Sequence, residues 1–244
     1  MINQLIINAD DFGMTEGVTI GILLAHQQGV LTSTTCMINM PFAEFALKQA
    51  QKFPQLGVGI HLVLTLGKPL IDGALSYTDE NGDFKRPSSY EDGKPHADEN
   101  ELYREWKAQI DKFIEIAGQK PTHIDSHHHV HLLPWHHNVV KRLAKEYNIP
   151  IRQEEQIAED LPYVPCDITF YNKKMNLEYF KELTEKYSHT LEIMCHPALL
   201  DQRLCNISSY TTLRMEELEI LRSPELIEFI KSNHIELINY SHIK

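Results

Sequence analysis

Residues 122–134 read Thr-His-Ile-Asp-Ser-His-His-His-Val-His-Leu-Leu-Pro, a short stretch that gathers five imidazoles around one carboxylate. In an extended strand, side chains alternate between two faces with a period of two. The alternation predicts one face with Asp125, His127, His129 and His131, and an opposite face with Ile124, Ser126, His128 and Val130. Neighbouring imidazolium charges repel, so the cluster makes chemical sense if some rings stay neutral and direct a lone pair at a cation.

A histidine-rich surface tract of low complexity is the alternative interpretation of this stretch. The tract has strand-like apolar flanks, and its carboxylate is in phase with the imidazoles. Both features favour a strand that carries a metal site.

Outward from this stretch, strand-like and helix-like patterns alternate seven or eight times along the chain. The predicted strands cover residues 4–9, 32–40, 57–65, the stretch from 122, 149–152, 167–171, 191–194 and 235–240. The predicted helices cover residues 15–28, 43–53, 99–117, 137–147, 177–187 and 212–232, the last broken near 223–224. For 244 residues this alternation predicts an α/β fold: a single (β/α)-barrel domain over 1–244, with seven or eight parallel strands. An open doubly wound sheet is the structural alternative.

Residues 66–100 interrupt the alternation, because they are rich in Gly, Pro, Asp, Ser and Lys and have few apolar anchors. A long irregular stretch inside a compact fold is usually a functional loop. We therefore expect an insertion that flanks a site, with Tyr77, Phe84 and Tyr90 available to stack on a ligand.

Composition limits the partners of this chain. A net charge of −11 argues against nucleic acid or an anionic membrane as the main partner. No apolar run reaches the roughly 20 residues of a membrane span, and the first residues lack the features of a signal peptide. Four cysteines without CxxC spacing fit reduced thiols in a cytoplasmic protein, and they offer no obvious nucleophile: Cys36, Cys166, Cys195 and Cys205.

Acidic, basic and imidazole side chains recur at the predicted strand ends: Asp10 and Asp11, His61, Asp125 and His127, Arg152, and His196. In parallel barrels the functional groups gather at the C-terminal mouth, so these side chains should converge although they are far apart in sequence. Two imidazoles and one carboxylate leave open positions on a metal for water and substrate. The chain offers Asp11, His61 and His127 as ligands, Asp10 as base and His196 as acid.

Each of these residues also has a plainer interpretation. Asp10 and Asp11 could cap the following helix as an Asx turn, and His61 could be a hydrogen-bonded core histidine. Arg152 could pair with a surface carboxylate, and His196 could be a turn residue before proline. Their coincidence at strand ends favours the site. The run at 214–217, Arg-Met-Glu-Glu, is expected to be a solvated helix face.

Several motifs resemble those of the YdjC-like carbohydrate deacetylases, also called chitooligosaccharide deacetylases. They are Asn-Ala-Asp-Asp-Phe-Gly at 8–13, Gly-Ile-His-Leu at 59–62, Asp-Ser-His-His-His-Val-His at 125–131, Glu-Ile-Met-Cys-His-Pro at 192–197 and the segment 209–218. The similarity runs from residue 5 to about 242. One departure is Ala198, where the family often has glycine.

The resemblance implies a barrel related to those of the polysaccharide deacetylases. It also implies hydrolysis of N-acetyl groups from amino sugars or small chitooligosaccharides such as diacetylchitobiose, with or without a phosphate, to release acetate. Asp11, His61 and His127 would hold a divalent metal, given as magnesium in the family, with Asp10 as base, His196 as acid and Arg152 orienting the base. Two imidazoles suit zinc or another transition metal better than magnesium. The insertion would close over the sugar.

Other functions fit the same barrel. A metal-dependent phosphoester hydrolase and a sugar isomerase are the enzymatic alternatives, and a catalytically silent sugar-binding protein is the non-enzymatic one. By analogy, residues 99–117 or the C-terminal helix could form a homodimer contact.

Overall fold

The computed structural model describes residues 2–73, 75–153, 156–157, 160–171 and 175–243. Its strands are β1 (Ile2–Phe12), β2 (Ser33–Cys36), β3 (Gly57–Leu62), β4 (Ile124–Ser126), β5 (Cys166–Asp167), β6 (His189–Cys195) and β7 (Glu236–Leu237). Its α-helices are α1 (Glu16–Gln28), α2 (Ala43–Ala50), α3 (Glu99–Ala117), α4 (His137–Tyr147), α5 (Leu177–Lys186), α6 (Gln202–Ile207), α7 (Thr212–Leu221) and α8 (Pro224–Ser232). No helix in these ranges is long and apolar enough to cross a membrane.

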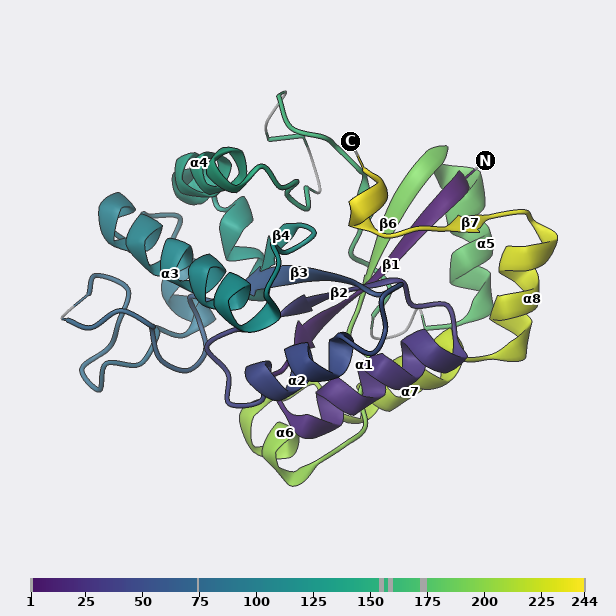
Figure 1. Cartoon of the computed structure of the whole chain (residues 1–244), viewed down its shortest axis with the longest axis horizontal. Coiled ribbons are helices and arrows are strands. Elements are labelled where there is room, and N and C mark those ends of the chain that lie inside the picture. The colour runs from purple at the N-terminus through teal and green to yellow at the C-terminus, as the bar shows by residue number, and fades with distance from the viewer. Residues whose placement is uncertain (1, 74, 154–155, 158–159, 172–174, 244) are drawn as a thin grey trace.

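The strands form one curled, seven-stranded parallel sheet in the order β4-β3-β2-β1-β6-β5, with β7 pairing with β1. Single parallel bridges, Ile124 with Ile151 and Gln153 with Pro165, lead from β4 across to the segment that enters β5. They join the two ends of the sheet and complete an irregular barrel. The (β/α)-barrel prediction is confirmed, and helices surround the sheet (Figure 1).

Strand β1 lies at the centre of the sheet, between β2 and β6. Every residue from Leu5 to Phe12 is therefore buried, whichever face it points to. Such a strand must be apolar where it meets helices. Ile7 and Ala9 meet this need, whereas Asn8 and Asp10 alternate with them and are buried all the same. The interior of the barrel is therefore polar at the C-terminal half of β1.

Helix ends follow local capping rules. Thr15 accepts a hydrogen bond from the Val18 backbone and begins α1, as predicted. Asp98 caps α3 in the same way, and left-handed Gly118 ends that helix. Helix α3 has the predicted bounds, and its Trp106 is buried. The break near 223–224 is also confirmed, because Pro224 begins α8.

Strands β1 and β6 are longer than the sequence predicts, whereas the other strands are shorter. The predicted strand 32–40 ends at Cys36, and the predicted strand 57–65 ends at Leu62. Residues 149–152 contribute one bridge instead of a strand. Strand-like composition continues past the last ladder pair because the mouth loops are also buried, as Val63 and Leu64 show. Helix α6 was not predicted.

The insertion at 66–98 is anchored to α3. The buried Glu105 carboxylate accepts backbone hydrogen bonds from Leu70 and Ile71 at 3.0–3.1 Å. Glu101 accepts one hydrogen bond from the Ser76 backbone N–H and one from the Ser76 hydroxyl, at 2.7 Å each. The expectation that the insertion's aromatic side chains are free to stack on a ligand is wrong: Tyr77, Phe84 and Tyr90 are no more than 5% exposed. These rings fix the loop to the core, because burying an aromatic ring is the main apolar gain available to so polar a segment.

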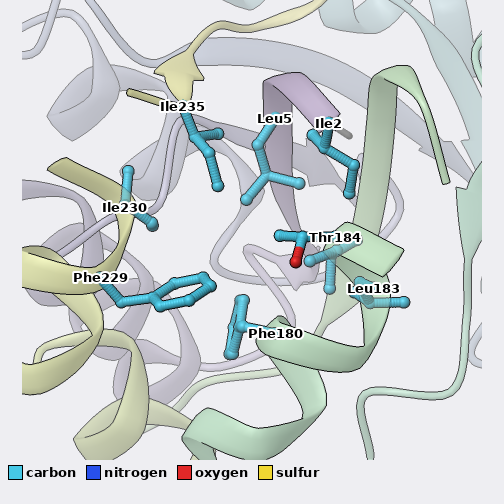
Figure 2. Close-up of a pocket in the computed structure, with 9 residues that line it drawn as sticks. Ile2, Leu5, Phe180, Leu183, Thr184, Phe229, Ile230 and Ile235 are labelled. Atoms are coloured by element: carbon cyan, nitrogen blue, oxygen red, sulfur yellow. The ribbon is translucent and has the colours of Figure 1, made fainter. Parts of the chain in front are cut away.

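A small apolar cavity lies where β1 begins (Figure 2). Phe180 of α5 and Phe229 of α8 face Ile2 and Leu5 across it. Its volume of about 10 Å³ is close to that of one water molecule. The cavity lies at the opposite end of β1 from Asp10, and its lining is apolar.

Gly59 in β3 gives a stability prediction. A Cβ there would lie 2.5 Å from His123 Nδ1, and the His123 ring cannot retreat because it stacks on Tyr240 with centroids 3.9 Å apart. Gly59→Ala should lower the free energy of unfolding by about 1–3 kcal/mol, measured by urea denaturation. The double variant Gly59→Ala/His123→Ala should be less destabilised than the sum of the single variants. Strict additivity would contradict the clash.

Candidate metal-dependent active site

Asp10 and Asp11 reach the same site because β1 is irregular there. Successive strand residues normally point to opposite faces. The register between β1 and β2 shifts between Ala9 and Phe12, and Asp11 has a left-handed φ of 69°. A bulge of this kind re-aims one side chain. Both carboxylates are thereby buried at the C-terminal mouth, at 1–2% exposure.

His61 is placed by the pairing of β3 with β4. His61 and Asp125 are direct partners in the register, so their side chains share the inner face. His61 Nδ1 lies 2.7 Å from Asp125 Oδ1, and Thr35 donates to Asp125 Oδ2 at 2.9 Å. Burial opposes the charged imidazole, but Asp125 and Asp10 raise the pKa of His61 to about 10. His61 Nδ1–H points at Asp125 and Nε2 faces Asp11, where a bound cation would take the place of the Nε2 proton.

The predicted alternation through the histidine stretch holds only as far as Ser126. Residues His127–Leu132 form 3₁₀ turns, in which His128 and His129 have left-handed φ values of 56° and 54°. The prediction that His127 and His128 lie on opposite faces is wrong: their ring centroids are 3.9 Å apart. The strand ends because the Ser126 hydroxyl accepts a hydrogen bond from the His131 backbone and so closes a turn.

Asp11, His61 and His127 come together as one group of possible metal ligands. Their donor atoms all lie within 4.8 Å of one another. His127 Nδ1 is 2.9 Å and His61 Nε2 is 3.5 Å from Asp11 Oδ1. Donors bound to one ion at about 2.0–2.2 Å are separated by roughly 3–3.5 Å, so the spacing fits a divalent cation. Asp11 Oδ1 is buried, and within the described ranges it has no hydrogen-bond partner of regular geometry.

Asp10, His61 and Asp125 form a second such group. Here a protein cation already fills the position: Arg152 Nη1 and Nη2 donate to the two Asp10 oxygens at 2.8 and 2.7 Å. Arg152 Nη1 also lies 2.8 Å from Asp125 Oδ2. The first group is therefore the better candidate for a metal, because its carboxylate oxygen is not neutralised by a guanidinium.

Arg152 is buried among three carboxylates. Besides Asp10 and Asp125, it donates through Nε to Glu192 Oε1 at 2.7 Å, and Tyr240 donates to the other Glu192 oxygen. Burial would raise the pKa of Asp10, but Arg152 holds it well below its usual range. A carboxylate kept so strongly ionised is a weak base, so a water that gives it a proton must itself be made acidic. That is the chemistry a bound cation supplies.

His196 follows β6 at the same mouth, with its side chain 18% exposed. Glu217 accepts a hydrogen bond from the His196 backbone and another from the Tyr210 hydroxyl. Burial and the Arg214 charge lower the pKa of His196 to about 4, while burial raises the pKa of Glu217 to about 7. Resting His196 is therefore neutral and must take up a proton before it acts as an acid. Glu217 Oε1 lies 4.0 Å from His196 Nδ1, which is too far for a direct hydrogen bond, and accepts one from the Tyr210 hydroxyl instead.

The expectation that residues 214–217 form a solvated helix face is wrong for two of the four. Arg214 and Glu217 are 3% and 0% exposed, whereas Met215 is 43% exposed. Their spacing of three residues puts them on the inner side of α7. Arg214 Nη2 donates to Asp11 Oδ2 at 2.7 Å.

The structure thus brings together all six side chains that the sequence singled out: Asp10, Asp11, His61, His127, Arg152 and His196. Sequence reasoning did not assign roles to Asp125, Glu192, Arg214 or Glu217. All four lie within the motifs quoted above, but the sequence does not show which members of a motif turn inward. Buried charge is the property that identifies them, and it requires coordinates.

Comparison with known proteins identifies the family of this chain. Residues 4–232 match the family described as YdjC-like protein. A Geobacillus stearothermophilus protein named carbohydrate deacetylase is 44% identical over 239 residues, covering 96% of each chain. A Vibrio cholerae protein of the same name is 37% identical over 247 residues, covering 98% of this chain and 95% of its own. A solved structure from Enterococcus faecalis, provisionally described as a cellobiose-phosphate cleavage protein, superposes with a TM-score of 0.91 at 37% identity and 99% coverage of both chains.

More distant structures share the fold alone. The peptidoglycan deacetylase PdaC of Bacillus subtilis superposes with a TM-score of 0.51 at 14% identity, over 98% of this chain and 89% of its own. The barrel therefore has the same fold as that deacetylase. Since the family match and the 44% identical relative each extend over nearly the whole chain, the protein belongs to the YdjC-like family.

Proposed function

We propose that this protein is a metal-dependent carbohydrate deacetylase that hydrolyses the N-acetyl group of an acetylated amino sugar or small chitooligosaccharide and releases acetate. The observation that carries the proposal is the meeting of a three-donor cation site with two further groups suited to proton transfer, Asp10 and His196, at one barrel mouth. The names of the full-length relatives support the substrate class.

Each side chain then has a task. Asp11, His61 and His127 would hold the cation, which when bound acidifies a water molecule and polarises the acyl oxygen. Asp10, held by Arg152, takes the proton of the attacking water. His196 gives a proton to the departing nitrogen, so that the amide bond breaks to acetate and a free amino sugar. Asp125 fixes the His61 ring so that Nε2 points at the cation.

The test of this function is a substrate panel. Purified protein with added divalent metal should release acetate from diacetylchitobiose or its phosphate, and leave phosphoesters and ketoses unchanged. The phosphorylated disaccharide belongs in the panel because the Enterococcus faecalis relative's description mentions a sugar phosphate. Turnover of a phosphoester or ketose without acetate release would replace the proposal with a phosphatase or an isomerase. Sugar binding without any turnover would indicate a silent binding protein.

Metal removal gives a separate prediction. Dialysis against a chelator should abolish acetate release, because Asp10 is too weak a base to activate ordinary water. Zinc, manganese or nickel should restore activity at lower concentration than magnesium, since two imidazoles and one carboxylate suit these ions better. Elemental analysis measures the bound ion, and circular dichroism confirms that the chelated protein stays folded. Full acetate release by metal-free protein would contradict the cation site.

A further inference from the structure

We infer that Arg214 of α7 belongs to the reaction centre: it fixes Asp11 so that one carboxylate oxygen faces the cation, and it offers an N–H of Nη1 to the acyl group of the substrate. The first part concerns the metal site, and the second rests on the proposed function.

The positioning role follows from the different neighbours of the two Asp11 carboxylate oxygens. Arg214 Nη2 donates to Oδ2 at 2.7 Å, while Oδ1 faces His61 and His127. Asp11 sits in a strained left-handed conformation. Because the guanidinium donates a hydrogen bond to one carboxylate oxygen, the other oxygen keeps pointing toward the ion site.

Arg214 is itself rigidly held. Its Nε donates to the Tyr210 backbone oxygen at 2.8 Å, and the side chain is 3% exposed. Because the guanidinium is planar, these two bonds fix the direction of the third nitrogen, Nη1. This atom is buried and has no acceptor within the described part of the chain. Burying a charged N–H without an acceptor costs free energy of folding, so the presence of such a group needs an explanation.

The surroundings of the Arg214 guanidinium supply such an explanation. The Arg214 guanidinium lies 5.5 Å from the Tyr210 ring centroid, and that ring in turn contacts the His196 ring at 5.7 Å. Arg214 therefore touches the carboxylate that would hold the cation, and the Tyr210 ring alone connects it to the imidazole that would protonate the leaving amine. An acetamide that spans the two groups would pass close to Arg214. Its oxygen gains negative charge as water adds, which a fixed guanidinium N–H stabilises.

Arg214→Met tests both parts, because methionine keeps the apolar stem and removes the donors. Calorimetric titration of chelated protein with Zn²⁺ should show affinity weakened about 10- to 100-fold. At saturating Zn²⁺, kcat for acetate release from diacetylchitobiose should fall roughly 10²–10³-fold with KM changed much less. Added guanidinium ion should restore part of kcat. Arg222→Met, at the C-cap of α7, is the matched control and should behave as wild type, because Arg222 is 30% exposed and pairs with Glu219 and Gln28.

The outcomes separate the claims. Unchanged Zn²⁺ affinity in Arg214→Met would overturn the positioning role, and wild-type kcat at saturating metal would overturn the donor role. If Arg214→Met does not fold, Arg214→Lys takes its place. Lysine can reach Asp11 but cannot also supply the third donor, so near-normal affinity with a lowered kcat is expected, and wild-type kcat would again overturn the donor role. If wild-type protein releases no acetate, the proposed function fails while the titration still tests Arg214.

Discussion

Asp10→Asn is expected to lower kcat for acetate release by roughly 10²–10⁴-fold while leaving about one metal ion bound per chain. Asparagine keeps the shape of the side chain and can still accept a hydrogen bond from Arg152, but it cannot take a proton from water. Arg152 keeps Asp125 and Glu192 as partners, so the buried charge stays compensated. Acetate assays with elemental analysis of the same sample measure both quantities.

The matched control for this variant is Asp92→Asn in the insertion, where the carboxylate pairs with His96 and with the Lys94 backbone N–H. Its turnover should equal wild type. Loss of the ion from Asp10→Asn would instead make Asp10 a ligand, in favour of the second donor group with His61 and Asp125. Normal turnover with the ion retained would remove Asp10 from the chemistry.

His127→Ala is expected to lose both the ion and activity, with acetate release reduced at least roughly 10³-fold. Of the three donors, His127 is the most exposed, at 12%, so its removal should disturb packing least. Asp11 would keep Arg214 and His61 as neighbours. Calorimetry with Zn²⁺, elemental analysis and the acetate assay each report a part of the effect.

His96→Ala serves as control for His127→Ala, because His96 is a half-buried insertion histidine at an i, i+4 ion pair. Both proteins should show similar thermal unfolding in the absence of metal. Undiminished turnover in His127→Ala would exclude His127 from the catalytic centre, and normal Zn²⁺ affinity would exclude it as a ligand.

The sequence predicted the barrel because periodicity is local. Apolar runs alternating with amphipathic helices predict parallel strands, and a long amphipathic stretch such as α3 was located to the residue. The failures lie at strand ends, where β2 and β3 stop early while burial continues. The buried aromatic residues of the insertion were missed for a similar reason, since a polar loop does not show where its few rings pack.

The sequence alone determined the fold class and six side chains placed to act together, because strand ends converge at a barrel mouth whatever the details of packing. Tertiary structure alone decided how those side chains are used. The bulge at Asp11 and the left-handed turn after Ser126 overrule strand alternation. They separate Asp10, whose two oxygens both accept from Arg152, from Asp11, whose Oδ1 is left for a cation while Oδ2 accepts from Arg214. The tertiary structure also showed that Arg214 and Glu217 of α7 point inward. Directions such as these depend on contacts between residues as far apart as 203 positions, which no local pattern encodes.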